Sequence, residues 1–413
     1  MNHRFNACRM LTCLFTLALL ASPAWLVACA GKTHEEHTDA ASARWKQVRS
    51  QMILDEAVSR FNAGDLDTAE RSVGEALNLH PSDPRMYTLL GRIALERGHL
   101  DRAHQLFQNA LEVDQNHPEA HYYRGIVLQR WERHEDAYES YRNAWHLVQD
   151  NPAFLLASAE MLLELDREDE ALELLESRLV YFEGNAALRA ALGQIHLMRG
   201  EIGQAIEYYR RATVLAPDDT TIREELALAK MAGGRHDAAI NTFEKLSEHP
   251  ETRDRRDIQF SLVRAYLAHG RANDARNVLL NLANDRPTDT SVWIKLGEAC
   301  WYADDMAGAL RAAERVIDLA PRRHEGYLLA GMVWKKRGDL ERALESLDRA
   351  AGAATDQAAP LILRGLTLED AGRPRAAMRA YREALERHPE HPRASALLQR
   401  LADAHDVDEL QRP

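Results

Sequence analysis

The sequence predicts an all-helical protein built as a solenoid of about ten helix–turn–helix units. Alanine recurs every 34 residues, a second small residue precedes each of these alanines by twelve positions, and glycine or proline falls between the segments with helical character. A regular period of this length is typical of repeat proteins in which each unit stacks on its neighbours. With 413 residues, 28% of them charged and only 7% aromatic, the chain is long enough for one extended array.

The alanine series sets the register of the repeat. Steps of 34 residues from Ala69 meet alanine as far as Ala239, and after one slip of two residues the series continues from Ala275. The series comprises Ala69, Ala103, Ala137, Ala171, Ala205, Ala239, Ala275, Ala309, Ala343 and Ala377. Small residues at this spacing indicate positions where two helix axes cross closely, because a larger side chain would hold the helices apart.

A second small position and a large one complete the pattern. The position twelve residues before each alanine is small in every unit except one, which has Val263. These residues are Ala57, Gly91, Gly125, Ala159, Gly193, Ala227, Val263, Gly297, Gly331 and Gly365. Four residues after the alanine most units have a larger side chain, such as Phe107 or Tyr381. That residue shares a helix face with the alanine, so we expect it to fill the space beside the crossing.

Units are predicted to begin near residues 50, 84, 118, 152, 186, 220, 256, 290, 324 and 358. Glycines such as Gly98 and Gly338 fall in the turn between the two helices, where a left-handed residue caps the first helix. Prolines such as Pro217 end the second helix. The array is therefore expected to occupy residues 50–391.

Three places depart from the regular repeat. The fourth unit has Arg178 at an alanine position and Glu183 at the closing proline, which makes it the weakest match. Two extra residues between units six and seven fall in the charged run 253–256, where we expect a wider loop. After the last unit, residues 392–405 have the apolar face and polar outer face of a capping helix, and 406–413 form a tail.

This pattern resembles the tetratricopeptide-repeat (TPR) family over residues 50–391. The eighth unit reproduces the family's W-x-x-L-G with Trp293, Leu296 and Gly297, although Cys300 stands where tyrosine is usual. The resemblance implies a right-handed superhelical solenoid that binds proteins, chiefly with positions 2, 5, 9, 12 and 13 of each first helix, which line the concave face. Carried over, these positions give Arg85, Arg92, Tyr122, Arg130, Glu160, Arg264, Glu298, Trp301, Tyr302, Met332, Lys335 and Lys336 as candidate partner-binding residues.

The pair Trp301 and Tyr302 admits two interpretations. Beside Lys335 and Lys336 of the next unit, the rings would form a flat apolar platform with charge at its edge, as in many protein-binding hot spots. Alternatively, the rings simply pack against the ninth unit. TPR domains that grip chaperone C-termini have asparagine at position 9, and no unit here has one, so that binding mode is not expected.

The N-terminus has the pattern of a secretory signal. Arg4 and Arg9 precede an uncharged apolar stretch that ends in Leu26-Val27-Ala28-Cys29. This ending resembles the lipobox of bacterial lipoproteins, which implies a signal peptide over residues 1–28, acylation of Cys29 and a tether over residues 29–49. By the family's sorting pattern, Ala30 implies the outer membrane, facing the periplasm, with an inner-membrane anchor as the alternative.

Two further expectations concern this region. An uncleaved membrane helix over residues 11–30 is the alternative to a lipoprotein signal, and Pro23 and the position of Cys29 argue against it. Residues 30–47 contain little that is strongly apolar, so we expect a solvated tether that would reach about 25 Å if flexible.

Composition and motifs exclude several function classes. A net charge of −12 is unfavourable for binding nucleic acid through bulk electrostatics. No phosphate-binding loop, nucleophile elbow or C-x-x-C motif is present, so we expect no cofactor and no enzymatic activity. His34 and His37 lack the i, i+4 spacing of zinc-binding helices, so we expect no metal. Cys300 falls at a packing position, where cysteine behaves as a small hydrophobe.

The sequence therefore predicts a membrane-anchored scaffold that binds other envelope proteins or peptide segments. By analogy with similar lipoproteins, it would hold components of a pilus, secretion or exopolysaccharide-export assembly. An adaptor that recruits peptidoglycan enzymes is a second hypothesis. A third, of another class, is an enzyme that uses Cys300 or the tether histidines, and a Cys300 that resists thiol reagents would leave it without a nucleophile.

Overall fold

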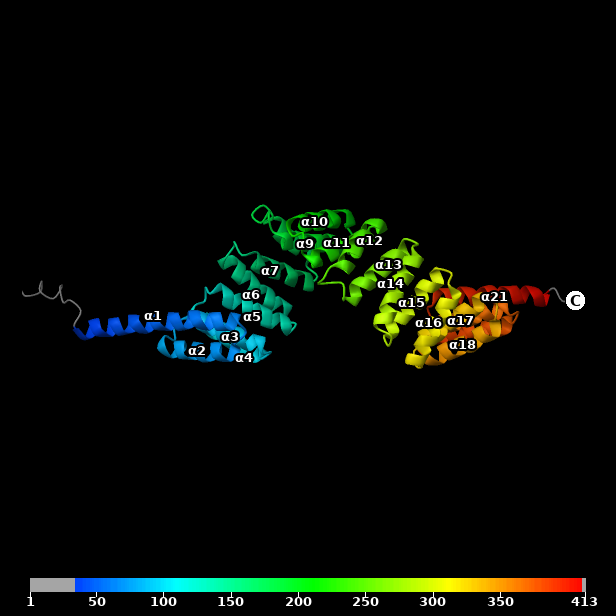
Figure 1. Ribbon diagram of the computed structural model, residues 1–413, viewed down its shortest axis with the longest axis horizontal. Coiled ribbons are helices and arrows are strands. Elements are labelled where there is room, and N and C mark those ends of the chain that lie inside the picture. Colours follow the sequence, from blue (N-terminus) through cyan, green and yellow to red (C-terminus); the bar gives the residue numbers. More distant parts are fainter. Residues whose placement is uncertain (1–33, 411–413) are drawn as a thin grey trace, which may run out of the picture. The chain divides into compact units, whose positions relative to one another are not determined.

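The computed structural model of the protein describes residues 34–410, with side chains for residues 38–403. Within residues 34–410 the chain forms 21 helices and no strand (Figure 1). The predicted all-helical fold class is thus confirmed. The predicted signal peptide and Cys29 lie outside the described residues.

Ten helix pairs follow one another along the chain, and from the second pair onward each first helix begins within one residue of its predicted start. The first helices are α1 (His34–Asn62), α3 (Pro84–Glu96), α5 (Pro118–Arg130), α7 (Pro152–Glu164), α9 (Ala186–Met198), α11 (Thr220–Ala232), α13 (Arg256–Ala268), α15 (Thr290–Tyr302), α17 (His324–Lys336) and α19 (Ala359–Asp370). The second helices are α2 (Leu66–Leu79), α4 (Leu100–Val113), α6 (His134–Leu147), α8 (Glu168–Glu176), α10 (Ile202–Leu215), α12 (His236–Glu248), α14 (Ala272–Asp285), α16 (Met306–Leu319), α18 (Leu340–Ala353) and α20 (Pro374–Arg387).

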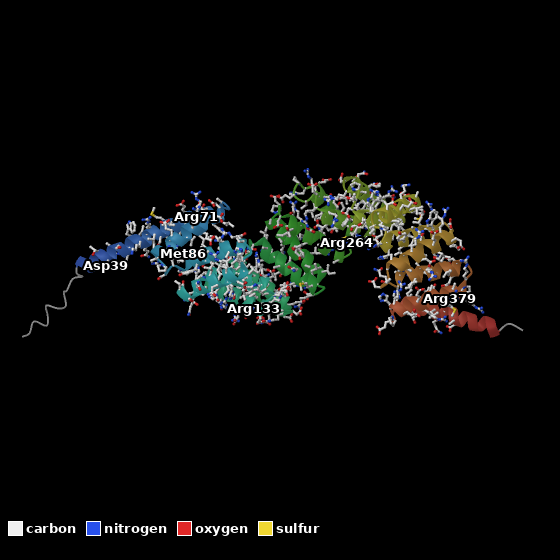
Figure 2. All side chains as sticks on the ribbon, turned by 90° about the horizontal axis from the view of Figure 1, so that it is seen from below. Asp39, Arg71, Met86, Arg133, Arg264 and Arg379 are labelled. Carbon is white, nitrogen blue, oxygen red and sulfur yellow. The ribbon has the colours of Figure 1, made fainter. Side chains whose placement is uncertain are left out.

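The chain divides into two compact units, one with α1 to α8 and one that begins at Arg178 and contains α9 to α21. Within each unit, every helix packs against the next one along the chain. Nitrogen- and oxygen-tipped side chains cover the outside of each unit, among them Arg71 and Arg133 in the first and Arg264 and Arg379 in the second (Figure 2). The division falls inside repeat four, the weakest match to the pattern.

The second helix of repeat four, α8, is unusually short. It has 9 residues, against 14 in α6 and in α10. It ends at Glu176, two residues before Arg178. A long charged side chain cannot take a position where the other units bring two helices close together, which gives a physical reason for the early end of the helix.

The crossing alanines lie where the pattern predicts. All ten have no exposed surface. The larger residue four positions on covers the small residue of the first helix, as expected. A Cβ atom added to Gly125 would lie 2.6 Å from the ring of Tyr141, and one added to Gly91 would overlap the ring of Phe107. The ring thus occupies the space that glycine leaves free, and the two helices approach closely.

In repeat eight, the space above the small residue Gly297 is filled in a different way. Its second helix has Ala313 where every other unit has a larger apolar or aromatic residue, so no large side chain of its own covers Gly297. Leu329 from α17 of the next repeat lies against Gly297 instead. The space is therefore filled from the neighbouring unit, which couples repeats eight and nine.

Each turn between the helices of a pair contains one residue with positive φ. It is glycine in seven pairs, as predicted, with φ between 69° and 82°. In the other three pairs it is Glu132, Asp166 or Asp304, with φ of 57–59°. The left-handed conformation costs about 1 kcal/mol for a residue that has a side chain. These three residues adopt it because the surrounding helices fix the course of the turn.

The ends of the array differ in how well they were predicted. Helix α1 begins at His34, so the predicted tether is helical over residues 34–47, and the reach of about 25 Å expected for a flexible chain does not apply there. Residues 38–49 contain neither glycine nor proline, so nothing in that stretch ends the helix. The predicted cap is confirmed as α21 (Pro392–Leu410), which buries Ala394 and packs Leu397 and Leu401 against the last pair.

Candidate protein-binding site

In the first unit, Arg92 lies between two aromatic rings. Its guanidinium carbon is 4.4 Å from the ring centroid of Phe61 and 5.0 Å from that of Tyr123. These three residues come from α1, α3 and α5, so cation–π contacts join three successive repeats. Neither ring was among the predicted site residues. Phe61 occupies position 12 of its unit, one of the positions carried over from the family, so the sequence contained the signal for it.

Tyr122 and Glu160 belong to one connected group. The Tyr122 ring centroid lies 5.5 Å from that of Tyr141 and 5.0 Å from that of Phe154, and burial raises the pKa of Tyr122. The Tyr141 hydroxyl donates to Gln129 Oε1 at 2.8 Å, and Gln129 Nε2 donates to Glu160 Oε1 at 3.0 Å. Tyr122 therefore serves the stacking of repeats three and four, and Glu160 remains on the surface beside it.

The other two candidates of this unit are surface arginines. Arg85 donates from Nη2 to Asp83 Oδ2 at 2.6 Å and also bonds to Gln51 of α1. Arg130 stands exposed at the end of α5. Of the five predicted residues of the first unit, Arg92 and Tyr122 therefore take part in the stacking of repeats. The other three lie on the surface.

In the second unit, α13 and α15 enclose a hollow of about 320 Å³ at the predicted concave positions. Its walls are formed by Phe260, Ser261, Val263, Arg264, Leu267, Lys295 and Glu298. Two predicted residues, Arg264 and Glu298, thus face one space from adjacent repeats. The Lys295 ammonium lies 5.3 Å from the ring centroid of Phe260. The hollow offers an apolar floor with both signs of charge at its edge.

Trp301 and Tyr302 have different surroundings. Trp301 is half-buried and packs against the core cluster of repeats six to nine. Lys336 from α17 lies 4.9 Å from its ring centroid and pairs with Asp304 at 2.6 Å. Tyr302, in contrast, has 68% of its surface exposed. The packing interpretation therefore describes Trp301, whereas Tyr302 presents a ring to solvent.

The remaining predicted residues lie on α17. Lys335 pairs with Asp370 at the end of α19, and Met332 is half-buried one turn before Lys336. Since both lysines already have carboxylate partners, the expected positive edge beside the rings is largely neutralised. The exposed, uncommitted part of this surface is Tyr302 together with the hollow between α13 and α15.

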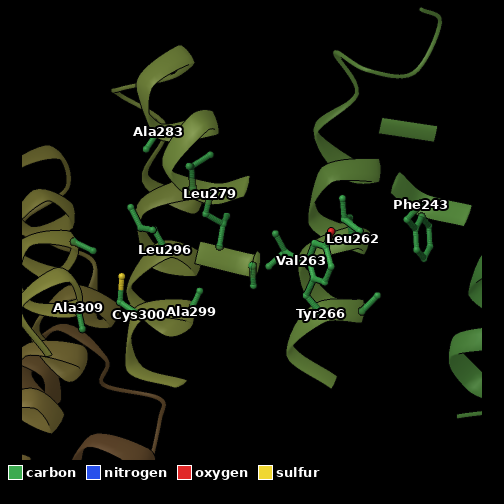
Figure 3. Close-up of a cluster of buried hydrophobic side chains, with 14 of the residues drawn as sticks. Phe243, Leu262, Val263, Tyr266, Leu279, Ala283, Leu296, Ala299, Cys300 and Ala309 are labelled. Atoms are coloured by element: carbon green, nitrogen blue, oxygen red, sulfur yellow. The ribbon is translucent and has the colours of Figure 1, made fainter. Parts of the chain in front are cut away.

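Cys300 is part of the core. It is 2% exposed and lies in one cluster with Leu296, Ala299 and Ala309 (Figure 3). Burial raises the pKa of its thiol to about 11, so the thiol is protonated at neutral pH and is a poor nucleophile. This environment argues against the hypothesis of an enzyme that uses Cys300.

The described part of the chain offers neither a metal site nor a membrane span. Among its side chains, no group of three or more His, Cys, Asp or Glu residues could hold a metal ion. The side chains of His34 and His37 lie outside that part. Over residues 34–410, no helix is both long enough and apolar enough to cross a bilayer.

The stacked helix pairs and their exposed side chains define a helical-repeat protein that works through protein–protein contacts. Models of the tetratricopeptide repeat match residues 60–124, 186–229, 230–298, 294–359 and 358–404, which together make up more than half of the chain. The chain therefore belongs to the TPR family.

Several solved structures are similar to this chain in fold. PilF of Pseudomonas aeruginosa is 15% identical, with a TM-score of 0.46 over 52% of this chain and 98% of that one. PilW, a widely conserved type IV pilus biogenesis factor, is 21% identical, with a TM-score of 0.45 over 49% of this chain and 94% of that one. Yeast Tom70 is 15% identical, with a TM-score of 0.43 over 88% and 90%. Such loose superpositions carry no inference about partners. No curated protein sequence matches the chain.

Proposed function

We propose that this protein is a membrane-anchored scaffold of the bacterial envelope, which holds components of a pilus, secretion or exopolysaccharide-export assembly. The observation that supports the scaffold role is the exposed surface of repeats seven and eight. There, the hollow lined by Arg264 and Glu298 and the exposed ring of Tyr302 lie on adjacent first helices of one unit. A peptide segment would meet the Phe260 ring in the hollow, with charge of both signs at its edge.

The anchoring part of the proposal rests on residues 26–29 of the sequence. Each buried CH₂ of an acyl chain contributes about 0.8 kcal/mol, so two or three chains on Cys29 would hold the protein firmly at a membrane. Residues 34–49 continue into the first repeat as helix α1. At a rise of about 1.5 Å per residue this segment is about 24 Å long, and it would act as a spacer.

Metabolic labelling with a palmitate analogue tests the anchor. We expect wild type to be labelled and to sediment with membranes, and Cys29→Ser to lose both properties. Cys8→Ser, which lies before the predicted cleavage site, is the matched control and should keep the label. A label that persists in Cys29→Ser would show that the anchor is assigned to the wrong residue.

Affinity capture from solubilised membranes tests the scaffold. We expect wild type to retain a specific set of envelope proteins, and Tyr302→Ala and Arg264→Glu to release them. Tyr181→Ala removes a tyrosine that is 74% exposed in the loop after α8, and this control should retain the set. Trp301→Ala is less informative, because it would also open the core. The identities of the captured proteins distinguish a surface assembly from peptidoglycan enzymes. If wild type captures no protein at all, the result contradicts the scaffold.

A further inference from the structure

A larger hollow lies in the first unit, and none of the predicted partner-binding residues lines it. It has a volume of about 660 Å³ and lies among α4, α5 and α6 of repeats two and three. Four of the lining residues are amides, and two of the three basic ones lie on α5. These six are Gln108, Gln115, Asn116, Asn143, His121 and Arg124.

Two polar residues on the first helix of repeat three line the hollow. Positions 4 and 7 of this repeat are His121 and Arg124, whereas repeat eight has the large apolar pair Trp293 and Leu296 there. His121 keeps the backbone contact of the tryptophan, since His121 Nε2 lies 2.9 Å from the carbonyl oxygen of Gln115 and Trp293 Nε1 donates to the corresponding carbonyl at 3.0 Å. An imidazole is smaller than an indole, and a guanidinium needs polar neighbours, so the space stays open.

The charge of Arg124 is poorly compensated within the chain. Arg124 is half-buried, and its Nε donates to Ser140 Oγ at 3.1 Å. Among the described side chains, no carboxylate forms an ion pair with it: the nearby Asp136 and Glu139 pair with other arginines, and Glu112 on the wall of the hollow is exposed. Burial lowers the pKa of the Arg124 guanidinium by more than the nearby carboxylates of Glu139 and Asp136 raise it, so the lost water is only partly replaced by negative charge.

Repeat ten provides an internal comparison, because Arg364 occupies the position that Arg124 has in repeat three. The Arg364 guanidinium pairs with Asp348 at 2.7 Å and with Glu383 at 3.3 Å. Seven repeats earlier, the residue that corresponds to Asp348 is Gln108, and the one that corresponds to Glu383 is Asn143. Both amides line the hollow of repeat three. The two carboxylates that neutralise Arg364 are thus replaced by amides.

We propose that the hollow between repeats two and three binds an aspartate or glutamate side chain of a partner protein, whose carboxylate takes the place that Asp348 and Glu383 fill in repeat ten. Arg124 supplies the positive charge. The amides both donate and accept hydrogen bonds, so they would hold the peptide backbone on either side of the acidic residue. This proposal rests on the proposed scaffold function and adds a second contact to it. The site shares no residue with the surface of repeats seven and eight, so the experiments on the two surfaces can fail independently.

The test is a peptide titration of the full-length protein in detergent. Binding is monitored through the NMR signal of the Arg124 Nε–H group. The probe is a pentapeptide, Ala-Ala-Glu-Ala-Ala, acetylated and amidated at its ends. We expect a saturable shift, and binding at least tenfold weaker for the same peptide with glutamine instead of glutamate. No shift up to roughly 10 mM peptide, or equal shifts with both peptides, would overturn the proposal.

Two further probes distinguish a side-chain carboxylate from a C-terminal carboxylate and from a small anion. One is the glutamine peptide with a free carboxyl terminus, and the other is inorganic phosphate. We expect both to bind more weakly than the glutamate peptide. If the free chain end binds better, the site takes a C-terminus rather than a side chain, and if phosphate binds equally well, it is a small-anion site. Either result overturns the proposal as stated.

Matched variants locate the site. Asn143→Glu supplies the carboxylate that repeat ten has, so we expect it to weaken glutamate-peptide binding at least tenfold, whereas Asn143→Gln should bind like wild type. Arg124→Gln should abolish the binding, and Arg364→Gln, at the corresponding position of repeat ten, should leave it unchanged. Circular dichroism confirms that each variant is folded. Wild-type binding by Asn143→Glu would contradict the proposed role of Arg124.

Discussion

Repeats three and ten share one apolar framework and differ in the polar groups around it. In both, a glycine of the first helix lies under a tyrosine ring of the second, with Gly125 under Tyr141 and Gly365 under Tyr381. At three corresponding positions near this crossing, the chain has amides around repeat three where it has carboxylates around repeat ten. The corresponding pairs are Gln108 and Asp348, Gln129 and Glu369, and Asn143 and Glu383.

This difference shows how a repeat protein can vary its surface at a constant fold. The crossing depends on residue size, and its alanine is therefore the same in all ten repeats. The polar positions beside it carry no such constraint, and replacing a carboxylate by an amide changes the charge with little change in shape. Arg364 is therefore paired with carboxylates of repeats nine and ten, whereas Arg124 forms no ion pair among the described side chains.

The largest expected effect concerns the shared framework. Gly125→Ala and Gly365→Ala place a Cβ atom inside a buried ring, so we expect each to destabilise its repeat by about 1–3 kcal/mol. Gly74 lies inside α2 with open space around it, and Gly74→Ala should stabilise by about 0.5–1 kcal/mol instead. Hydrogen exchange of the affected helices measures both. Stabilisation by all three changes would refute the close crossing.

The tyrosine hydroxyls distinguish the two repeats. Tyr141 donates to the neutral Gln129 at 2.8 Å, whereas Tyr381 donates to the carboxylate of Glu369 at 2.5 Å. Hydrogen bonds to charged groups contribute more, so Tyr381→Phe should cost about 2 kcal/mol and Tyr141→Phe about 1 kcal/mol. Urea unfolding of the two variants tests this order. Equal costs would mean that the carboxylate of Glu369 gives no added strength.

In the turns, we expect corresponding substitutions in the two repeats to change stability in opposite directions, by smaller amounts. Repeat three has Glu132 in the left-handed conformation, with φ of 59°, and repeat ten has Gly372 with φ of 69°. Glu132→Gly should therefore stabilise by about 0.5–1 kcal/mol, and Gly372→Ala should destabilise by about 1 kcal/mol. Thermal unfolding of the two variants measures the signs, and destabilisation by Glu132→Gly would show that its side chain makes a compensating contact.

Much of the fold was predictable from the sequence because the crossing depends on local residue size. The alanine series located the helix pairs, and the composition of residues 392–405 indicated the cap. The helical course of residues 34–47 was missed, because low apolar content indicated only that the segment is solvated. The left-handed Glu132 and Asp304 were missed as well, since only glycine marks that conformation in a sequence.

The candidate site was less predictable. Family positions identified Arg264 and Glu298, which the structure brings to one hollow. Burial separated Trp301 from Tyr302, and no sequence pattern distinguishes two adjacent aromatic residues in this way. The hollow around Arg124 had a signal in the sequence that went unused, because His121 and Arg124 stand where repeat eight has Trp293 and Leu296. What required the structure was the absence of a carboxylate partner.

Charge compensation at Arg124 and Arg364 is measured most directly by the stability of three variants in low salt. Asn143→Glu should be more stable than its uncharged control Asn143→Gln by about 0.5–1 kcal/mol, because the new carboxylate pairs with Arg124. Glu383→Gln should be less stable than wild type by a similar amount, because Arg364 loses a partner. Both differences should shrink in high salt. An Asn143→Glu variant no more stable than Asn143→Gln would contradict the account of an uncompensated Arg124.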